Sequence, residues 1–182
     1  MEFIPLEVTE VIHIQPKVFE DERGFFLESY HKERFEAGGI QADFVQDNYS
    51  ASRQGVLRGL HYQIRQAQGK LVQVTVGEVY DVAVDLRRSS PAFGRCVEQI
   101  LSSEKKNQIW IPPGFAHGFY VLSEWAEILY KATDYYAPQW ERTLLWNDPA
   151  LGIHWPLISG RPPVLSAKDA EGRPLAQAET YD

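Results

Sequence analysis

The sequence contains very little cysteine. Cys96 is the single cysteine among 182 residues, so an intrachain disulfide and a cluster of thiolate metal ligands are both excluded. A chain without disulfides is typical of a reducing compartment, and we expect a cytoplasmic protein. Long apolar runs are also absent: no stretch approaches the roughly 18 apolar residues that a membrane span needs. The first residues lack the basic and apolar regions of a signal peptide, so we expect neither export nor a membrane partner.

Positive charge is scarce as well. Lys and Arg total 18 against 25 Asp and Glu, which gives a formal net charge of -7. This balance disfavours binding to a nucleic acid polymer, although a few arginines can still bind one phosphorylated ligand. Hydrophobic residues make up 44% of the chain and charged residues 24%, which excludes disorder. The length favours one domain over residues 1–182, with a barrel core over roughly 40–150.

Helix signals are few, and most apolar residues alternate with polar ones over short runs. Two short helices are predicted, one over His31–Ala37 and one starting near Ser102 or Ser103. The runs Leu71–Val76 and Val79–Leu86, separated by Gly77 and Glu78, predict a hairpin. Further strands are expected over Glu7–Ile14, Phe25–Tyr30, Phe44–Ser50, Cys96–Leu101, Gln108–Ile111, Gly118–Leu122 and Glu127–Thr133. The pattern indicates an all-β jelly roll or barrel with an N-terminal strand arm and an extended C-terminal tail containing Gly152–Pro163.

Polar residues interrupt two of these strands. His61 shares a strand face with Gly59 and Gln63, and a glycine there allows a ligand or another backbone to approach closely. A histidine in this setting can equally be a hydrogen-bonded core residue. Lys70 opens an apolar strand, and it either lies in solvent or points into the barrel. In the second case the ammonium needs a partner, and Asp81 or Asp85 could provide one.

A third motif is the spacing Pro-x-Gly-x-x-His over Pro112–His117. It resembles the second motif of the cupin family, in which this histidine binds a metal in the metal-containing members. The first cupin motif would supply more histidines, but here it has only His61. His61 and His117 are too few for a mononuclear metal site, so the motif predicts a cupin-type jelly-roll β-barrel without a metal.

Two further residues have open interpretations at this stage. Tyr130 could pack in the core, act as an acid at the mouth of a cavity, or stack on a base or sugar. Arg23 precedes an aromatic strand and could be a surface residue. Together with Arg58 it could also form a fork for phosphate oxygens.

The motifs in combination resemble the dTDP-4-dehydrorhamnose 3,5-epimerase family, which are cofactor-free cupins. The similarity covers most of residues 18–176, and its most specific parts are Arg58–Gln63 and Pro112–Phe119. The resemblance implies an isomerase of dTDP-L-rhamnose biosynthesis. It would convert dTDP-4-dehydro-6-deoxy-D-glucose to dTDP-4-dehydro-L-rhamnose by epimerisation at C3 and C5, without a cofactor.

The resemblance also assigns roles to individual residues. His61 is the base, Asp169 orients it, Tyr130 is the acid on the opposite face of the sugar, and Lys70 stabilises the enolate oxygen. Arg23 and Glu28 act with the pocket of a neighbouring subunit, which implies a homodimer with sites completed across the interface. The remaining contacts with the dTDP-sugar, counting the diphosphate and nucleotide ends, are Gln46, Asp47, Asn48, Arg58, His117, Tyr136, Glu141 and Lys168.

This assignment agrees with the chemistry of the residue types. A proton next to a ketone becomes removable when a fixed cation stabilises the developing enolate, and histidine titrates near neutral pH. Inversion requires a second group on the opposite face. The alternatives are an enzyme that inverts only C3 or only C5, a metal-dependent cupin, and a sugar-binding cupin without activity.

Overall fold

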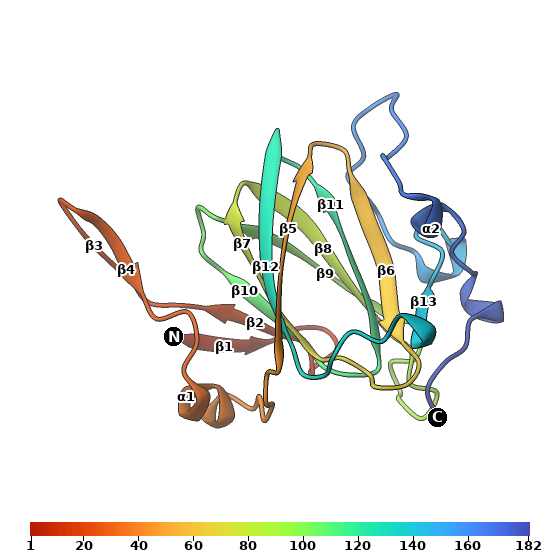
Figure 1. The fold of residues 1–182 in the computed structure, drawn as a ribbon, viewed down its shortest axis with the longest axis horizontal. Helices are drawn as coiled ribbons and strands as arrows, with labels where there is room; N and C mark the ends of the chain where they lie inside the picture. The colour runs from red at the N-terminus through yellow and green to blue at the C-terminus, as the bar shows by residue number, and fades with distance from the viewer.

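Two antiparallel sheets form the body of the molecule. The structure is a computed structural model that describes residues 1–182. The first sheet has six strands in the order β1 (Glu2–Pro5), β2 (Ile12–Gln15), β10 (Gln108–Ile111), β7 (Lys70–Val76), β12 (Trp125–Ala132) and β5 (Gln46–Arg53). The second has five strands in the order β13 (Glu141–Thr143), β6 (Leu57–Gln63), β11 (Phe115–Val121), β8 (Glu78–Asp85) and β9 (Cys96–Ser102). The sheets face each other (Figure 1), as predicted for an all-β jelly roll.

The main hydrophobic core fills one part of the space between the sheets. Val72 and Val74 of β7 pack there against Ala83 of β8 and Phe119 of β11. The opposite face of the five-stranded sheet, which includes Val82, Val84 and Leu86, packs in a second cluster under the C-terminal segment. Successive residues of a strand point to opposite faces, so the odd-numbered side chains of β8, Asp81 and Asp85 included, point between the sheets.

The predicted hairpin between the runs 71–76 and 79–86 is wrong. β7 pairs with β10 and β12, whereas β8 pairs with β9 and β11 in the other sheet. Gly77, with φ 78°, turns the chain from one sheet into the other. A Cβ at this position would overlap the carbonyl oxygen of Trp125, so only glycine fits. Alternating polarity predicts two strands joined by a turn, but it does not distinguish a hairpin from a corner between sheets.

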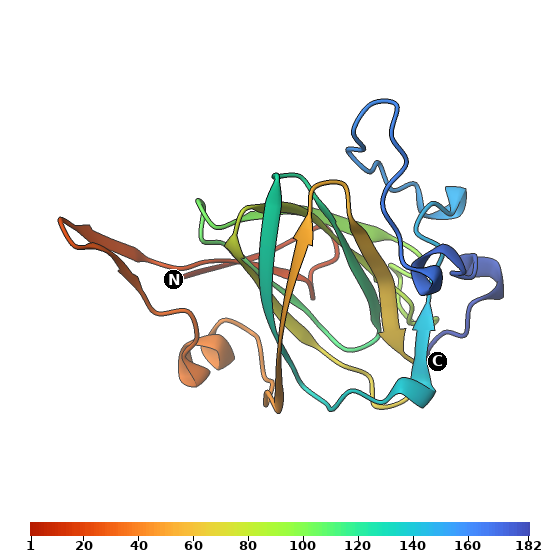
Figure 2. The same cartoon turned by 45° about the horizontal axis from the view of Figure 1, so that its top comes forward.

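The N-terminal arm contains a separate two-stranded hairpin, β3 (Val18–Asp21) and β4 (Gly24–Leu27). This hairpin projects away from the body of the molecule, as both ribbon views show (Figures 1 and 2). The helix predicted from His31 is present as α1 (Lys32–Ala37), and it buries Phe35. The helix predicted near Ser102 is wrong. Residues 103–106 form a turn, which the Asn107 side chain closes through hydrogen bonds to the backbone of Ile100 and Ser102.

The C-terminal segment packs against the outer side of β6 and β13 (Figure 1). It runs without regular structure over most of Gly152–Pro163, as expected, and then forms the short helix α2 (Ala167–Ala170) beside β6. Three 3-10 turns complete the list of elements: η1 (Pro138–Trp140), η2 (Pro149–Leu151) and η3 (Leu175–Gln177). No helix has the length and apolar character to cross a membrane.

Candidate active site

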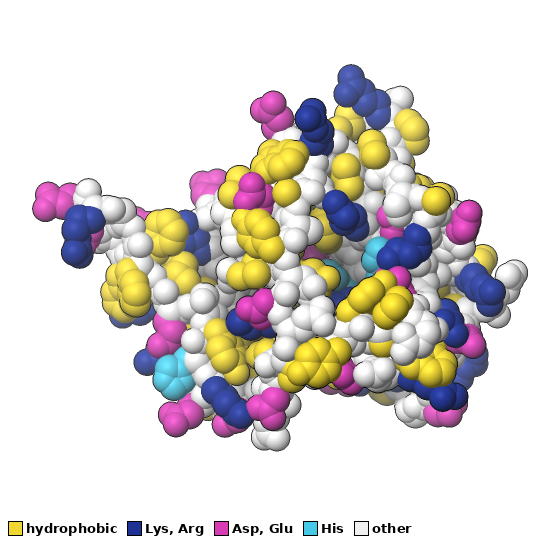
Figure 3. Space-filling model, viewed as in Figure 1, with side chains coloured by type: hydrophobic (Ala, Val, Ile, Leu, Met, Phe, Trp, Pro, Cys, Tyr) yellow, Lys and Arg dark blue, Asp and Glu magenta, His cyan; other side chains and the backbone are white.

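A cavity of about 410 Å³ lies between the two sheets and brings most of the predicted site residues together. Histidine, lysine and arginine side chains surround a hollow near the centre of the face in Figure 3. The cavity is lined by Asn48, Tyr49, Ser50, Arg58, His61, Lys70, His117, Gly118, Phe119, Tyr130, Tyr136, Glu141, Ser166, Lys168 and Asp169.

His61 and Asp169 form a hydrogen-bonded pair on one wall. Nε2 of His61 lies 2.6 Å from Oδ1 of Asp169, and the Asp169 side chain is only 4% exposed. Burial lowers the pKa of His61, and the hydrogen bond with Asp169 partly opposes this effect. Burial alone would raise the pKa of Asp169, but hydrogen bonds from His61, Ser166 and Gly59 hold it below its ordinary value. The pair therefore favours a neutral imidazole next to an ionised carboxylate near neutral pH.

The local sequence explains why His61 points into the cavity. Leu60 and Tyr62 belong to the hydrophobic cluster on the outer face of β6, so His61 between them faces inward. The backbone at Gly59 and Gly118 approaches closely, and a Cβ on Gly59 would lie 2.5 Å from the Cα of Gly118. The glycine thus permits contact with another backbone. The Gln63 side chain is used structurally, because it bonds to the backbone of Gln66, Tyr135 and Ala137.

Asp169 reaches His61 from a short helix that it also caps. Ser166 is the N-cap of α2 and donates its hydroxyl to Oδ2 of Asp169 at 2.6 Å. The Asp169 backbone N–H donates to Oγ of Ser166 at 3.2 Å, and the Ser166 backbone N–H donates to Oδ2 of Asp169 at 3.2 Å. This reciprocal capping box fixes the carboxylate. The role of Ser166 was missed at the sequence level, although the Ser-x-x-Asp spacing signals it.

Tyr130 and Lys70 lie on the opposite wall, because they belong to the six-stranded sheet. On the paired strands β12 and β7, Tyr130 is opposite Val72 and Ala132 is opposite Lys70. Burial raises the pKa of Tyr130, and the nearby Glu141 acts in the same direction. Burial lowers the pKa of Lys70 to about 8. Of the two partners predicted for Lys70, Asp81 acts on its charge, whereas Asp85 pairs with Arg87 at 2.7 Å.

Polar side chains form the rim of the cavity. Nε of Arg58 donates to Oγ of Ser52 at 3.0 Å and Nη2 donates to the Ala51 carbonyl at 3.3 Å, while Nη1 has no hydrogen-bond partner within the chain. Gln46 does not line the cavity but contacts two residues that do: it accepts a hydrogen bond from the Tyr136 backbone and donates one to Asn48. A second chain of contacts runs from the Tyr136 hydroxyl to Glu141 at 3.0 Å and from Glu141 to the Lys168 ammonium at 2.8 Å.

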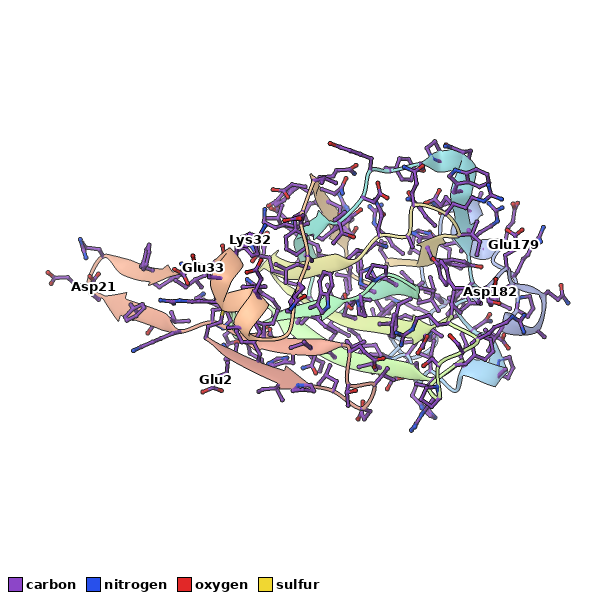
Figure 4. All side chains as sticks on the ribbon, turned by 90° about the horizontal axis from the view of Figure 1, so that it is seen from below. Glu2, Asp21, Lys32, Glu33, Glu179 and Asp182 are labelled. Atoms are coloured by element: carbon purple, nitrogen blue, oxygen red, sulfur yellow. The ribbon has the colours of Figure 1, made fainter.

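Three predicted residues lie elsewhere in this chain. Arg23 belongs to the turn between β3 and β4 and pairs with Asp21, which Figure 4 shows at the far end of the hairpin. Glu28 pairs with Arg34 at 2.9 Å. Asp47 points away from the cavity and pairs with Lys131 at 3.0 Å. A phosphate fork of Arg23 and Arg58 within one subunit is therefore incompatible with this structure.

His117 faces the cavity from β11. It is the cross-strand neighbour of His61 on the paired strand β6, in the same sheet. Its Nε2 lies 2.8 Å from Oδ2 of Asp81, and both side chains are buried. The two histidines of the cavity are thus each hydrogen-bonded to a carboxylate. No group of three His, Cys, Asp or Glu side chains is arranged to hold a metal ion.

Comparison with known proteins identifies the family to which the chain belongs. The family model described as dTDP-4-dehydrorhamnose 3,5-epimerase matches residues 5–177. The chain belongs to the dTDP-4-dehydrorhamnose 3,5-epimerase family. The family member of Pseudomonas aeruginosa is 60% identical over 97% of both chains, and that of Salmonella typhimurium is 56% identical over 96% of both.

A solved structure of the family has nearly the same fold. The crystal structure of dTDP-6-deoxy-D-glucose-3,5-epimerase from Legionella pneumophila superposes with a TM-score of 0.94 at 54% identity, covering 98% of this chain and 94% of the other. That protein was crystallised in complex with dTDP-4-keto-L-rhamnose. The family membership and the cupin-type fold predicted from the motifs are confirmed. The roles of the individual site residues remain predictions.

Proposed function

We propose that this protein is the isomerase that epimerises C3 and C5 of dTDP-4-dehydro-6-deoxy-D-glucose to give dTDP-4-dehydro-L-rhamnose. The family model and relatives of up to 60% identity support this activity, and a related structure contains a dTDP-4-keto sugar. Within this chain, the decisive observation is the placement of His61 on one sheet, paired with Asp169 of α2, and of Tyr130 on the facing sheet, with one cavity between them.

His61 is the group that removes the protons. With Asp169 accepting from Nε2–H, the lone pair of the imidazole is on Nδ1, and it takes the proton from the carbon next to the ketone. Asp169 holds this tautomer and stabilises the imidazolium that forms. The electron pair of the broken C–H bond becomes the enolate double bond, and the negative charge moves to the oxygen at C4. The same step then occurs at the second carbon.

Lys70 and Tyr130 complete the reaction from the other wall. The Lys70 ammonium stabilises the enolate oxygen electrostatically, because it is a fixed cation at the place where the negative charge develops. Tyr130 donates its phenolic proton to the carbon from the face opposite His61, and this inverts the configuration. The phenolate then regains a proton and the imidazolium loses one to solvent. Holding both groups across one substrate contributes much of the rate.

The rim residues bind the nucleotide diphosphate. Arg58 provides a guanidinium for phosphate oxygens, and Gln46 and Asn48 provide amide groups for the nucleotide end. Tyr136 stacks near the substrate, while Glu141 and Lys168 contact it from β13 and α2. His117 lines the inner part of the pocket. Binding energy from the nucleotide, remote from the reacting carbons, holds the sugar in place.

Arg23 and Glu28 complete the site of a second subunit in a homodimer. The β3–β4 hairpin that carries Arg23 projects from the body (Figure 4). Phe25 and Phe26 on it are 59% and 70% exposed, and exposed aromatic residues on a projecting element are typical of a contact with a partner. In this arrangement Arg23 reaches the diphosphate bound to the neighbouring chain.

Proton NMR of the substrate in deuterated water tests the proposal. The wild-type protein should exchange the hydrogens at C3 and C5 and form the L-rhamno product. His61→Ala should abolish exchange while binding of dTDP persists. Tyr130→Phe should retain part of the exchange but lose product formation. Exchange at one carbon alone would identify an enzyme that inverts one centre, and binding without any exchange would identify a sugar-binding protein.

A further inference from the structure

Asp81 is a buried carboxyl group that does not line the cavity but lies behind two side chains that do. It is 0% exposed on β8, and the odd-numbered positions of this strand point between the sheets. Oδ2 lies 2.8 Å from Nε2 of His117. Oδ1 is buried and has no hydrogen-bond partner within the chain. A buried polar atom without a partner is costly, so this oxygen calls for an explanation.

The Lys70 ammonium supplies a positive charge that Asp81 stabilises through space, although no hydrogen bond or ion pair joins it to Oδ1. Lys70 forms no direct ion pair, although it is a cation between the sheets. Among the carboxylates that favour its charged form, Asp81 has the largest effect and Glu141 the next. Lys168 acts in the opposite direction. The titratable groups that share the cavity with Lys70 come from each surrounding element: His61 from β6, His117 from β11, Tyr130 from β12, Glu141 from β13, and Lys168 and Asp169 from α2.

We propose that Asp81 is a positioning residue of this site: its Oδ2 holds the His117 ring, and its negative charge between the sheets keeps the Lys70 side chain in the ammonium form. This inference rests on the proposed function, because Lys70 matters as the cation next to the enolate oxygen. Asp81 itself touches no substrate atom. Its effect on the reaction passes through the charge of Lys70 and the orientation of His117.

Asp81→Asn tests the proposal, with Asp85→Asn as a matched control. Both carboxylates are fully buried on β8 and point between the sheets, but Asp85 bonds to Arg87 and Ser90. Removing the charge of Asp81 lowers the pKa of Lys70 further below about 8. In a plot of kcat against pH, the fall in kcat at high pH reflects the loss of the Lys70 proton. This fall should therefore move to lower pH by about one unit. The fall for Asp85→Asn should stay at the wild-type pH, even if the protein becomes less stable.

Binding of dTDP separates the outcomes. Asp81→Asn should bind dTDP as the wild type does, because the nucleotide contacts lie at the rim, so the loss should appear in kcat. An unchanged fall in kcat at high pH in an Asp81→Asn protein that binds dTDP would overturn the proposal. A wild-type protein that binds dTDP but exchanges no substrate hydrogen would instead contradict the proposed function. The two failures are thus distinguishable.

A double-mutant cycle of Asp81→Asn and Lys70→Met, measured by the free energy of unfolding, tests the proposal if Asp81→Asn alone does not fold. If Asp81 and Lys70 compensate each other, the substitution should cost less free energy of unfolding in a Lys70→Met background than in the wild type. A double variant that folds, with this difference in urea denaturation, supports the proposal. A double variant that does not fold, or that shows no coupling, contradicts it, because Asp81 would then stabilise the fold through other neighbours.

Discussion

The Asp169 carboxylate bonds to two side chains at once. Oδ1 lies next to His61, and Oδ2 accepts hydrogen bonds from Ser166 at the start of α2. Asp169 therefore bonds to the proposed base and also caps a helix. The two functions involve different oxygens, so separate substitutions can distinguish them.

Asp169→Asn should reduce kcat by about 100-fold or more, because an amide no longer fixes the tautomer of His61 or stabilises the imidazolium. The hydrogen bond and charge of Asp169 raise the pKa of His61 against the effect of burial. Without them this pKa falls further, so the acidic limb of kcat/KM should move to lower pH. Rate measurements over pH check both effects. Ser166→Ala is the control: it retains the charge and should leave the limb in place.

The buried ammonium of Lys70 is expected to lower the free energy of unfolding, although the proposed reaction needs it. Its pKa is lowered from 10.5 to about 8, so below pH 8 the folded protein contains an ammonium that is more stable in the unfolded chain. This penalty is about 3 kcal/mol. Lys70→Met should therefore raise the free energy of unfolding at pH 7 by about 1–3 kcal/mol while abolishing activity.

The pH dependence checks this explanation. The unfolded chain binds the additional proton between pH 8 and pH 10.5, so the stability of the wild type rises over this interval. The advantage of Lys70→Met in urea denaturation should shrink accordingly as the pH increases. An advantage independent of pH would indicate better packing rather than the removal of a buried charge.

At the scale of elements, the close approach of the paired strands β6 and β11 sets the positions of His61 and His117. Gly59 and Gly118 meet there, and the strand register shifts between His117 and Phe119. A Cβ on Gly118 would lie 2.6 Å from the carbonyl oxygen of Arg58. The two strands can therefore approach only because both residues lack a side chain.

Gly118→Ala should force β6 and β11 apart and destabilise the protein by about 1–3 kcal/mol. The displacement also moves both histidines, so kcat should fall more than the fraction of folded protein does. Urea denaturation and substrate exchange measure the two effects on the same sample. Gly160→Ala is the comparison for kcat: its positive φ of 71° means that alanine also costs stability there, but a Cβ meets no atom within 4 Å. It should leave kcat unchanged.

The sequence predicts most of the elements but not how they are connected in space. The period-two runs identify the strands because each has one face in a core, as in Val72 and Val74. The pairing of β7 was predicted wrongly, since a short Gly-containing turn occurs both in hairpins and at corners between sheets. The wall to which each side chain belongs depends on that pairing. This is why the opposed positions of His61 and Tyr130 did not follow from spacing, and why Asp81 remained one of two possible partners for Lys70.

At the scale of the whole molecule, the β3–β4 hairpin places Arg23 far from the cavity of its own chain. If a dimer uses this residue in the neighbouring site, two inactive variants can complement each other. The His61→Ala subunit still carries Arg23 on its hairpin, and the Arg23→Ala subunit still carries His61 in its cavity. A mixed dimer then contains one complete site.

Mixing denatured His61→Ala and Arg23→Ala and refolding them together should restore about one quarter of the wild-type activity, because half of the dimers are mixed and each has one complete site. Each variant refolded alone measures the background. Activity no greater than the sum of the two backgrounds would place Arg23 in the site of its own chain or outside any site.

The contact between α2 and β6 has a consequence for inhibitor design. Asp169, the proposed orienting partner of His61, lies on a short helix beside β6, which is held by its cap and by a few neighbouring contacts. A compound that wedges α2 away from β6 would withdraw the carboxylate from the imidazole without entering the sugar pocket. Such a compound would lower kcat without competing with the substrate. A high concentration of the sugar nucleotide would therefore not displace it.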